Sequence, residues 1–240
     1  MDMDAEREQL IETWHGVVAQ KWRQNPCCDM LRLLDAKNKV FNMPFRRCHD
    51  RLGWKSKDDL RLGGICAGTI YRTDSFMKGP LCKRTGKKTG QTVHIEHTVP
   101  VKVLESKWSE FRNDRPITEA DQKVAYAWLL THSVTTAFAK GQEAQLTPVK
   151  DTTAAFDKKS DDFGLPFRRY KALSNPQDIV WNVLSKQCID FNTWTFEQHL
   201  DSILKLMREA WGRTSFPEIA CLETLGKPLA YALRPRLPAY

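Results

Sequence analysis

Apolar side chains at helical spacing are the feature that most restricts the fold of this chain. In residues 4–24 they recur one helical turn apart until Asn25-Pro26, where proline stops a helix. The same spacing returns in later segments: 28–40, 118–131, 177–187 and 196–211. Stretches rich in β-branched residues are short by comparison. We therefore expect an α+β chain that is predominantly helical.

Short segments between these helices have the composition of strands. Residues 65–71 follow a Gly-Gly pair, residues 91–101 contain Pro100, which would stop strand pairing, and residues 133–138 are β-branched. Residues 140–143 then begin a short helix. We divide the chain into a helical N-terminal region (1–62), a strand-bearing region (63–150) and a helical, basic C-terminal region (151–240), which together form one compact unit.

Charge and composition limit the classes of function. Lys and Arg number 37 against 29 acidic residues, which gives a net charge of +8 and favours a polyanionic partner. A hydrophobic content of 41% is typical of a globular chain and argues against disorder. No apolar stretch is long enough to span a membrane, and the acidic N-terminus does not resemble a secretory signal. The seven cysteines lack the spacing of a disulfide framework, so we expect a reducing, cytoplasmic setting with mostly buried thiols.

Glu96 and His97 are the residues that carry a specific chemistry. Hydrolysis of a phosphodiester needs a deprotonated water and positive charge at the phosphate. Histidine is the natural base near neutral pH, and a carboxylate is a natural ligand for Mg²⁺. If the strand ends at His97, an irregular backbone would direct both side chains to one phosphate. The alternatives are a packed strand histidine and a surface carboxylate paired with a lysine.

The run His94 to Val101, with the sequence His-Ile-Glu-His-Thr-Val-Pro-Val, resembles the first half of the HNH (ββα-metal) nuclease motif. That family carries an acid–histidine pair and then a proline on the first strand of a hairpin, although its acid is more often Asp. The resemblance implies that Glu96 binds Mg²⁺ or Mn²⁺ and that His97 activates water. It also implies a ββα-metal (HNH-like) catalytic hairpin embedded in region 63–150.

The second half of that motif supplies a polar residue on the second strand and a metal ligand at the start of a helix. His132 resembles the former, and Gln142 or Glu143 would be the latter. The gap from His97 to His132 is longer than in the family, with the helix at 118–131 inserted. His132 could instead complement a helix dipole, and an acid in a first helical turn is commonplace.

Basic residues outside the motif are candidates for DNA contacts. A glycine-punctuated turn next to the motif and a second basic run supply them: Lys83, Arg84, Lys87, Lys88, Arg168 and Arg169. Such residues grip phosphates or simply form a solvated basic face. Cys27-Cys28 and Cys48-His49 lack the two-residue gap of zinc ligands, so we do not expect a structural Zn²⁺.

Together these features predict a metal-dependent endonuclease acting on double-stranded DNA. The helical flanks favour a sequence-specific restriction endonuclease, which would act as a homodimer on a palindromic site. A nonspecific DNase from a toxin or phage is the alternative within enzymes. A non-catalytic nucleic-acid-binding protein, in which Glu96 and His97 are structural, is the alternative outside them.

Overall fold

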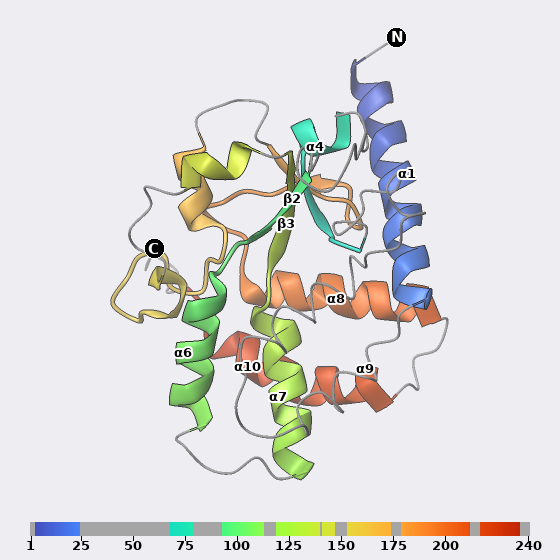
Figure 1. Ribbon diagram of the computed structural model, residues 1–240. Helices are drawn as coiled ribbons and strands as arrows, with labels where there is room; N and C mark the ends of the chain where they lie inside the picture. Colours follow the sequence, from blue (N-terminus) through green and yellow to red (C-terminus); the bar gives the residue numbers. More distant parts are fainter. Residues whose placement is uncertain are drawn as a thin grey trace, which may run out of the picture.

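The protein is an α+β structure built around a mixed five-stranded sheet (Figure 1). The computed structural model describes residues 3–24, 68–78, 93–112, 119–139, 141–146, 153–173, 179–211 and 217–235. The strands are β1 (Tyr71–Thr73), β2 (Val93–His97), β3 (Thr135–Ala139), β4 (Val180–Asn182) and β5 (Gln187–Cys188). Their order is β2-β3-β1-β4-β5. β1 runs parallel to β3, and the other neighbouring strands are antiparallel.

Helices surround this sheet, with α8 crossing beneath it and α7, α9 and α10 gathered on the far side of α8 (Figure 1). The α-helices are α1 (Met3–Gln24), α4 (Asp74–Lys78), α6 (Val101–Arg112), α7 (Glu119–His132), α8 (Phe196–Trp211), α9 (Pro217–Cys221) and α10 (Lys227–Tyr231). Short turns of other helix types are η3 (Gln142–Leu146), η4 (Ala154–Phe156), η5 (Arg168–Ala172) and η7 (Leu222–Gly226).

α8 begins at Phe196 because Thr195 caps it. The Thr195 hydroxyl accepts a hydrogen bond from the Gln198 amide at 3.2 Å, and the Gln198 side chain accepts one from the Thr195 amide at 2.8 Å. This reciprocal pair satisfies donors that the first helical turn leaves open. The helix then buries one apolar face, and its His199 ring bonds to the Leu130 carbonyl and to the Tyr71 hydroxyl. α8 thereby joins α7 to the centre of the sheet.

The structure confirms the helices expected at 4–24, 118–131 and 196–211 within two residues at each end. The helix expected at 177–187 is wrong, because this segment forms β4, a turn and β5. In that turn the Asn182 side chain accepts hydrogen bonds from two following amides, and Lys186 adopts a φ of 57°. Local turn chemistry therefore outweighs the apolar spacing.

Several other boundaries differ from expectation. β1 begins at Tyr71, after a turn and bend, so the strand expected at 65–71 lies further along the chain. Pro100 does more than stop β2, since its carbonyl accepts the Leu104 amide in the first turn of α6, a helix that the sequence analysis did not anticipate. The helix expected at 28–40 lies outside the described residues.

The sheet draws strands from two of the expected regions. β1 comes from 63–150 and pairs with β4 from 151–240, with Tyr71 opposite Asn182. No described helix is long and apolar enough to cross a membrane. Of the cysteines that the structure describes, Cys188 and Cys221, neither forms a disulfide, and Cys188 is exposed rather than buried.

Candidate functional site

Glu96 and His97 lie at the end of β2, which stands at one end of the order of described strands. Glu96 is opposite Thr136 and His97 is opposite Thr135 in the antiparallel pairing with β3. The pairing stays regular beyond them, since the Thr98 amide donates to the Val134 carbonyl at 3.0 Å. The expected irregular backbone is therefore absent at these two residues. The pleat directs Glu96 to the side shared with His94 and His97 to the other side.

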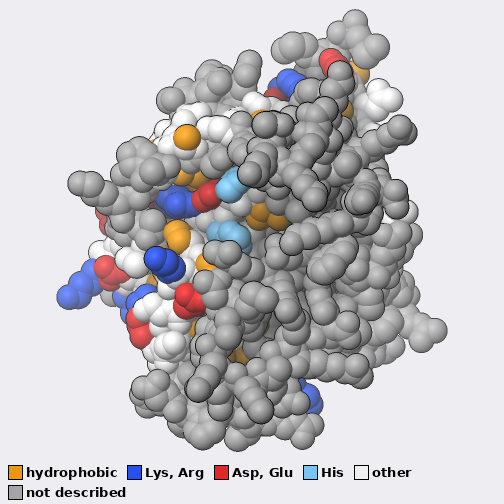
Figure 2. Space-filling view, in the orientation of Figure 1, with side chains coloured by type: hydrophobic (Ala, Val, Ile, Leu, Met, Phe, Trp, Pro, Cys, Tyr) orange, Lys and Arg blue, Asp and Glu red, His pale blue; other side chains and the backbone are white. Residues whose placement is uncertain are grey.

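The Glu96 carboxylate is held between a guanidinium and an imidazole. One of its oxygens forms an ion pair with Arg169, and the other lies 3.6 Å from the His94 Nε2. Arg169 also donates from Nη2 to the His97 carbonyl at 2.9 Å. Figure 2 shows basic, acidic and histidine side chains gathered on the face of the molecule that it draws. Arg169 thus bridges the Glu96 side chain and the His97 backbone.

A buried hydroxyl network fixes Arg169 in this position. The neighbouring Tyr170 is fully buried, and its hydroxyl lies 3.1 Å from the Thr98 Oγ1, which in turn lies 3.2 Å from the Thr136 Oγ1. This chain of hydroxyls ties η5 to the ends of β2 and β3. Burial raises the pKa of Tyr170, so its hydroxyl stays neutral, and burial lowers the pKa of Arg169 from its ordinary value. An arginine still keeps its charge under such a shift.

A hollow of about 250 Å³ lies beside this bridge. Its wall includes three cations of η5, namely Arg168, Arg169 and Lys171, and one acid, Asp162. Arg168 is paired with Asp162 and also donates to the Asn192 side chain. We call this cavity the η5 hollow. It has an excess of positive charge and touches Thr98, the residue that follows His97.

The described residues do not, as arranged, form a metal site. Among them, no group of three or more His, Cys, Asp or Glu lies close enough to hold an ion. Glu96 already has Arg169 as its counter-ion. The Gln142 side-chain oxygen accepts hydrogen bonds from the Thr73 hydroxyl and the Ala139 amide, each at 3.0 Å. Glu143 lies in η3, and its side chain lies outside the described part of the structure.

His132 closes α7 inside the hydrophobic core, only 1% exposed. Its Nδ1 lies 2.8 Å from the Trp128 carbonyl, and its ring packs against Trp128, Phe156 and Phe196. Burial lowers the pKa of His132 to about 3. The ring is therefore neutral at physiological pH and stabilises the core. This environment gives no support to the catalytic role that the motif implied, which stays a prediction.

Some predicted residues lie outside the described structure, and some residues of the site were not predicted. The basic turn (Lys83, Arg84, Lys87 and Lys88) and the cysteine–histidine candidates (Cys27, Cys28, Cys48 and His49) belong to the former group. Lys171 and Thr98 belong to the latter. Lys171 follows the predicted Arg168-Arg169 pair after one intervening residue, and this proximity in the sequence is a signal that could have identified it.

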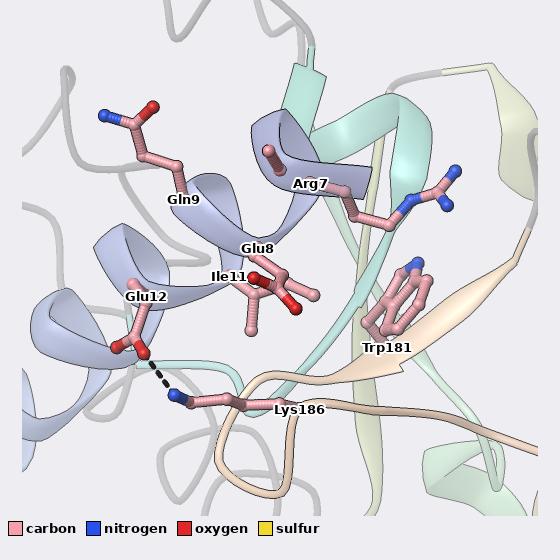
Figure 3. A pocket seen from close by; sticks show the side chains of 8 residues that line it. Arg7, Glu8, Gln9, Ile11, Glu12, Trp181 and Lys186 are labelled. Atoms are coloured by element: carbon pink, nitrogen blue, oxygen red, sulfur yellow. Dashed lines mark hydrogen bonds and ion pairs between the residues drawn. The ribbon is translucent and has the colours of Figure 1, made fainter. Parts of the chain in front are cut away.

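A larger cleft of about 730 Å³ lies between the N-terminal half of α1 and the β4–β5 turn (Figure 3). Trp181 forms one wall, with the Arg7 guanidinium 5.3 Å from its ring centroid. Glu12 and Lys186 form an ion pair at the other end, and Glu8 points into the space between (Figure 3). The lining therefore combines acids and bases, in contrast to the η5 hollow.

The comparisons with known proteins add no relatives. No protein-family model, no curated protein and no solved structure matches this chain.

Proposed function

We propose that the protein is an endonuclease that hydrolyses phosphodiester bonds in double-stranded DNA. The observation that carries the proposal is Arg169, which contacts both the Glu96 carboxylate and the His97 carbonyl and lines the η5 hollow. The Glu96 carboxylate, the His97 backbone and a cation-lined cavity for an anion therefore lie together, and the His97 side chain projects from the next position of the same strand. The overall charge of +8 fits a polyanionic substrate.

The proposed chemistry assigns a separate part to each of these groups. His97 takes a proton from the attacking water, the usual task of a histidine near neutral pH. Arg169 and the other cations of the hollow stabilise negative charge that grows on the phosphate oxygens. β2 lies at the end of the described strand order, so a phosphate along this strand meets side chains from both sides of the pleat. Because the described residues lack a complete metal site, no step is assigned to a cation here.

The proposed catalytic hairpin, cofactor, specificity and oligomeric state come from the resemblance to the HNH family. A ββα-metal hairpin would consist of β2, β3 and η3, since the two strands pair antiparallel and a short helix follows. Mg²⁺ or Mn²⁺ is the proposed cofactor. We propose sequence-specific cleavage by a homodimer in the cytoplasm, as for a restriction endonuclease, because a two-fold dimer matches a palindromic site.

The competing function is non-catalytic DNA binding, because the Glu96–Arg169 ion pair could serve only to stabilise the fold. Incubation of the purified protein with plasmid and Mg²⁺ separates the two. We expect cleavage that EDTA abolishes and that a Glu96→Gln preparation, purified identically, lacks. Discrete bands indicate a restriction endonuclease, and a smear indicates a nonspecific DNase. An intact plasmid at high protein concentration would contradict both enzymatic functions.

A further inference from the structure

The η5 hollow has the size and the charge of a site for one phosphate group. Its volume of about 250 Å³ lies just below the roughly 300–1,000 Å³ of sites that enclose a whole small molecule. Its charged wall consists of two guanidinium groups, one ammonium group and one carboxylate. Such cations bind oxyanions through charge-assisted hydrogen bonds.

Lys171 supplies the positive charge that the protein itself does not neutralise. Arg168 is paired with Asp162, and Arg169 is paired with Glu96. Lys171 is exposed and forms no ion pair within the described part of the chain. With Glu96 included, the groups around the hollow therefore carry one positive charge in excess. An anion in the hollow can pair with Lys171 while both arginines keep their carboxylates.

Two further features favour an anion in this place. The hollow touches Val99, and the 12-residue helix α6 begins two positions later, so the positive end of its dipole is close. The Arg169 Nη2 is held by the Glu96 carboxylate and the His97 carbonyl, so this cation loses little conformational freedom when an anion binds. Its buried Nε has no hydrogen-bond partner among the described residues, which leaves one donor open for an oxyanion.

We propose that the η5 hollow binds the terminal phosphate of a DNA strand, a phosphate monoester, more tightly than an internal phosphodiester. This inference rests on the proposed function, because hydrolysis creates such a group. Water adds across one P–O bond: its oxygen and one proton stay with the phosphorus, and the other proton goes to the oxygen of the departing strand. The new monoester loses its second proton with a pKa of about 6, so near pH 7 it carries almost two negative charges. An internal phosphodiester carries one. The cut end therefore stays in the hollow and slows release of the product.

The first experiment compares three fluorescent duplexes that differ only in their ends, which carry hydroxyl groups, 5′-phosphates or 3′-phosphates. Anisotropy is measured with the wild-type protein in EDTA, so that no metal ion contributes to binding. We expect one of the phosphorylated duplexes to bind about fivefold more tightly than the hydroxyl-ended duplex, the contribution of one exposed charge pair. Equal affinity for all three duplexes would overturn the proposal, and this comparison needs no variant.

The second experiment assigns the preference to the hollow. Lys171→Gln removes the unneutralised charge and should reduce the preference to less than about twofold. Lys123→Gln is the matched control, because Lys123 is an exposed lysine of α7 that does not line the hollow. The preference should stay unchanged in that variant. An equal loss in both variants would show that the terminal charge is attracted by the whole protein, and the proposal would fail.

Inorganic phosphate distinguishes a DNA end from the free ion. We expect it to displace the phosphorylated duplex more effectively than chloride at the same ionic strength, and to lose this advantage with Lys171→Gln. Competition by inorganic phosphate without any preference among the duplexes would assign the hollow to the free ion and overturn its role at DNA ends. These experiments measure binding alone. A plasmid that stays intact therefore overturns the proposed enzyme, whereas the preference for terminal phosphates is decided separately.

Discussion

Two carboxylates on opposite sides of the sheet are both held by an arginine, yet their surroundings differ. Asp74, at the start of α4, is 5% exposed and contacts Arg7 at 3.1 Å, Lys78 at 3.3 Å and the Trp181 Nε1 at 2.6 Å. Glu96 is 16% exposed and contacts Arg169 and His94. The contacts of Asp74 join α1, α4 and β4. Arg169, the ion-pair partner of Glu96, also lines the η5 hollow.

The two carboxylates also differ in the charge of the cavity near each of them. The cleft near Asp74 is the larger, but Glu8 and Glu12 contribute negative charge to its wall. The η5 hollow is about a third of that volume and has three cations to one acid. A polyanion gains electrostatic energy in the hollow and little in the cleft. Size alone would thus favour the cleft, whereas charge favours the η5 hollow as the place for the proposed polyanion.

The largest expected effect is on the rate of DNA cleavage, and it tests whether the proposed reaction needs the histidine on β2 and not one on α1. His97→Ala should reduce the cleavage rate by about 10²–10⁴, the usual cost of losing a general base. His15→Ala is the matched control, since His15 pairs with Glu209 at 2.6 Å on the α1 side and should leave the rate within a factor of about three. The measurement is single-turnover plasmid cleavage. Equal rates for the two variants would remove His97 from the mechanism.

Folding stability should show the reverse order. Asp74→Asn leaves Arg7 and Lys78 without their carboxylate, and we expect the free energy of unfolding to fall by about 3 kcal/mol, as for a broken buried pair. Glu96→Gln should lower it by only about 1 kcal/mol, because Arg169 loses a single charged partner and keeps its hydrogen bond to the His97 carbonyl. Urea unfolding of both variants tests this. A larger loss for Glu96→Gln would make Glu96 the structural carboxylate.

The elements that the sequence predicted well are those with long periodic patterns. α1, α7 and α8 each repeat an apolar face over several turns, which fixes their type. The segment at 177–187 is short and apolar, and such a run does not distinguish a buried helix from strands. Its outcome depends on the pairing of β4 with β1, a contact between residues over a hundred positions apart. Periodicity within one segment contains no information about that partner.

The same limit applies to the candidate site. Glu96 and His97 are neighbours in the sequence, so their joint position on one strand could be predicted. Arg169 lies 72 positions from His97, and its run of basic residues indicated a DNA contact without indicating the Glu96 partner. The hydroxyl network that holds η5 joins Thr98, Thr136 and Tyr170 across three segments. Only the folded chain brings these residues together.

Two buried histidines of the core should make the stability depend on pH. Burial lowers the pKa of His132 to about 3 and that of His199 to about 4. Below pH 6.5 the unfolded chain therefore binds protons that the folded chain does not, so stability falls as the pH decreases from 6.5 toward 4. Each histidine should lower the free energy of unfolding by about 1 kcal/mol as the pH falls from 6.5 to 5.5.

His132→Phe keeps an aromatic ring in the core and should remove the part of this loss that His132 causes, as measured by urea unfolding at both pH values. An unchanged pH dependence would show that His132 is not neutral in the folded protein.

The smallest expected effect concerns one phosphate contact and sharpens the contrast between hollow and cleft. Lys171 is an exposed cation of the η5 hollow, and Lys186 is an exposed cation of the cleft beside α1. Neutralising one phosphate contributes about 0.9 to the slope of log affinity against log salt on duplex DNA. In a His97→Ala background, Lys171→Gln should therefore lower this slope by up to about 0.9, equally on duplexes of different sequence, because a lysine contacts phosphate as a point charge. Lys186→Gln should leave the slope unchanged, since that lysine already pairs with Glu12.

A salt slope that responds to Lys186→Gln and not to Lys171→Gln would place the DNA on the side of the cleft. A loss confined to one sequence would show that Lys171 contacts bases rather than phosphates.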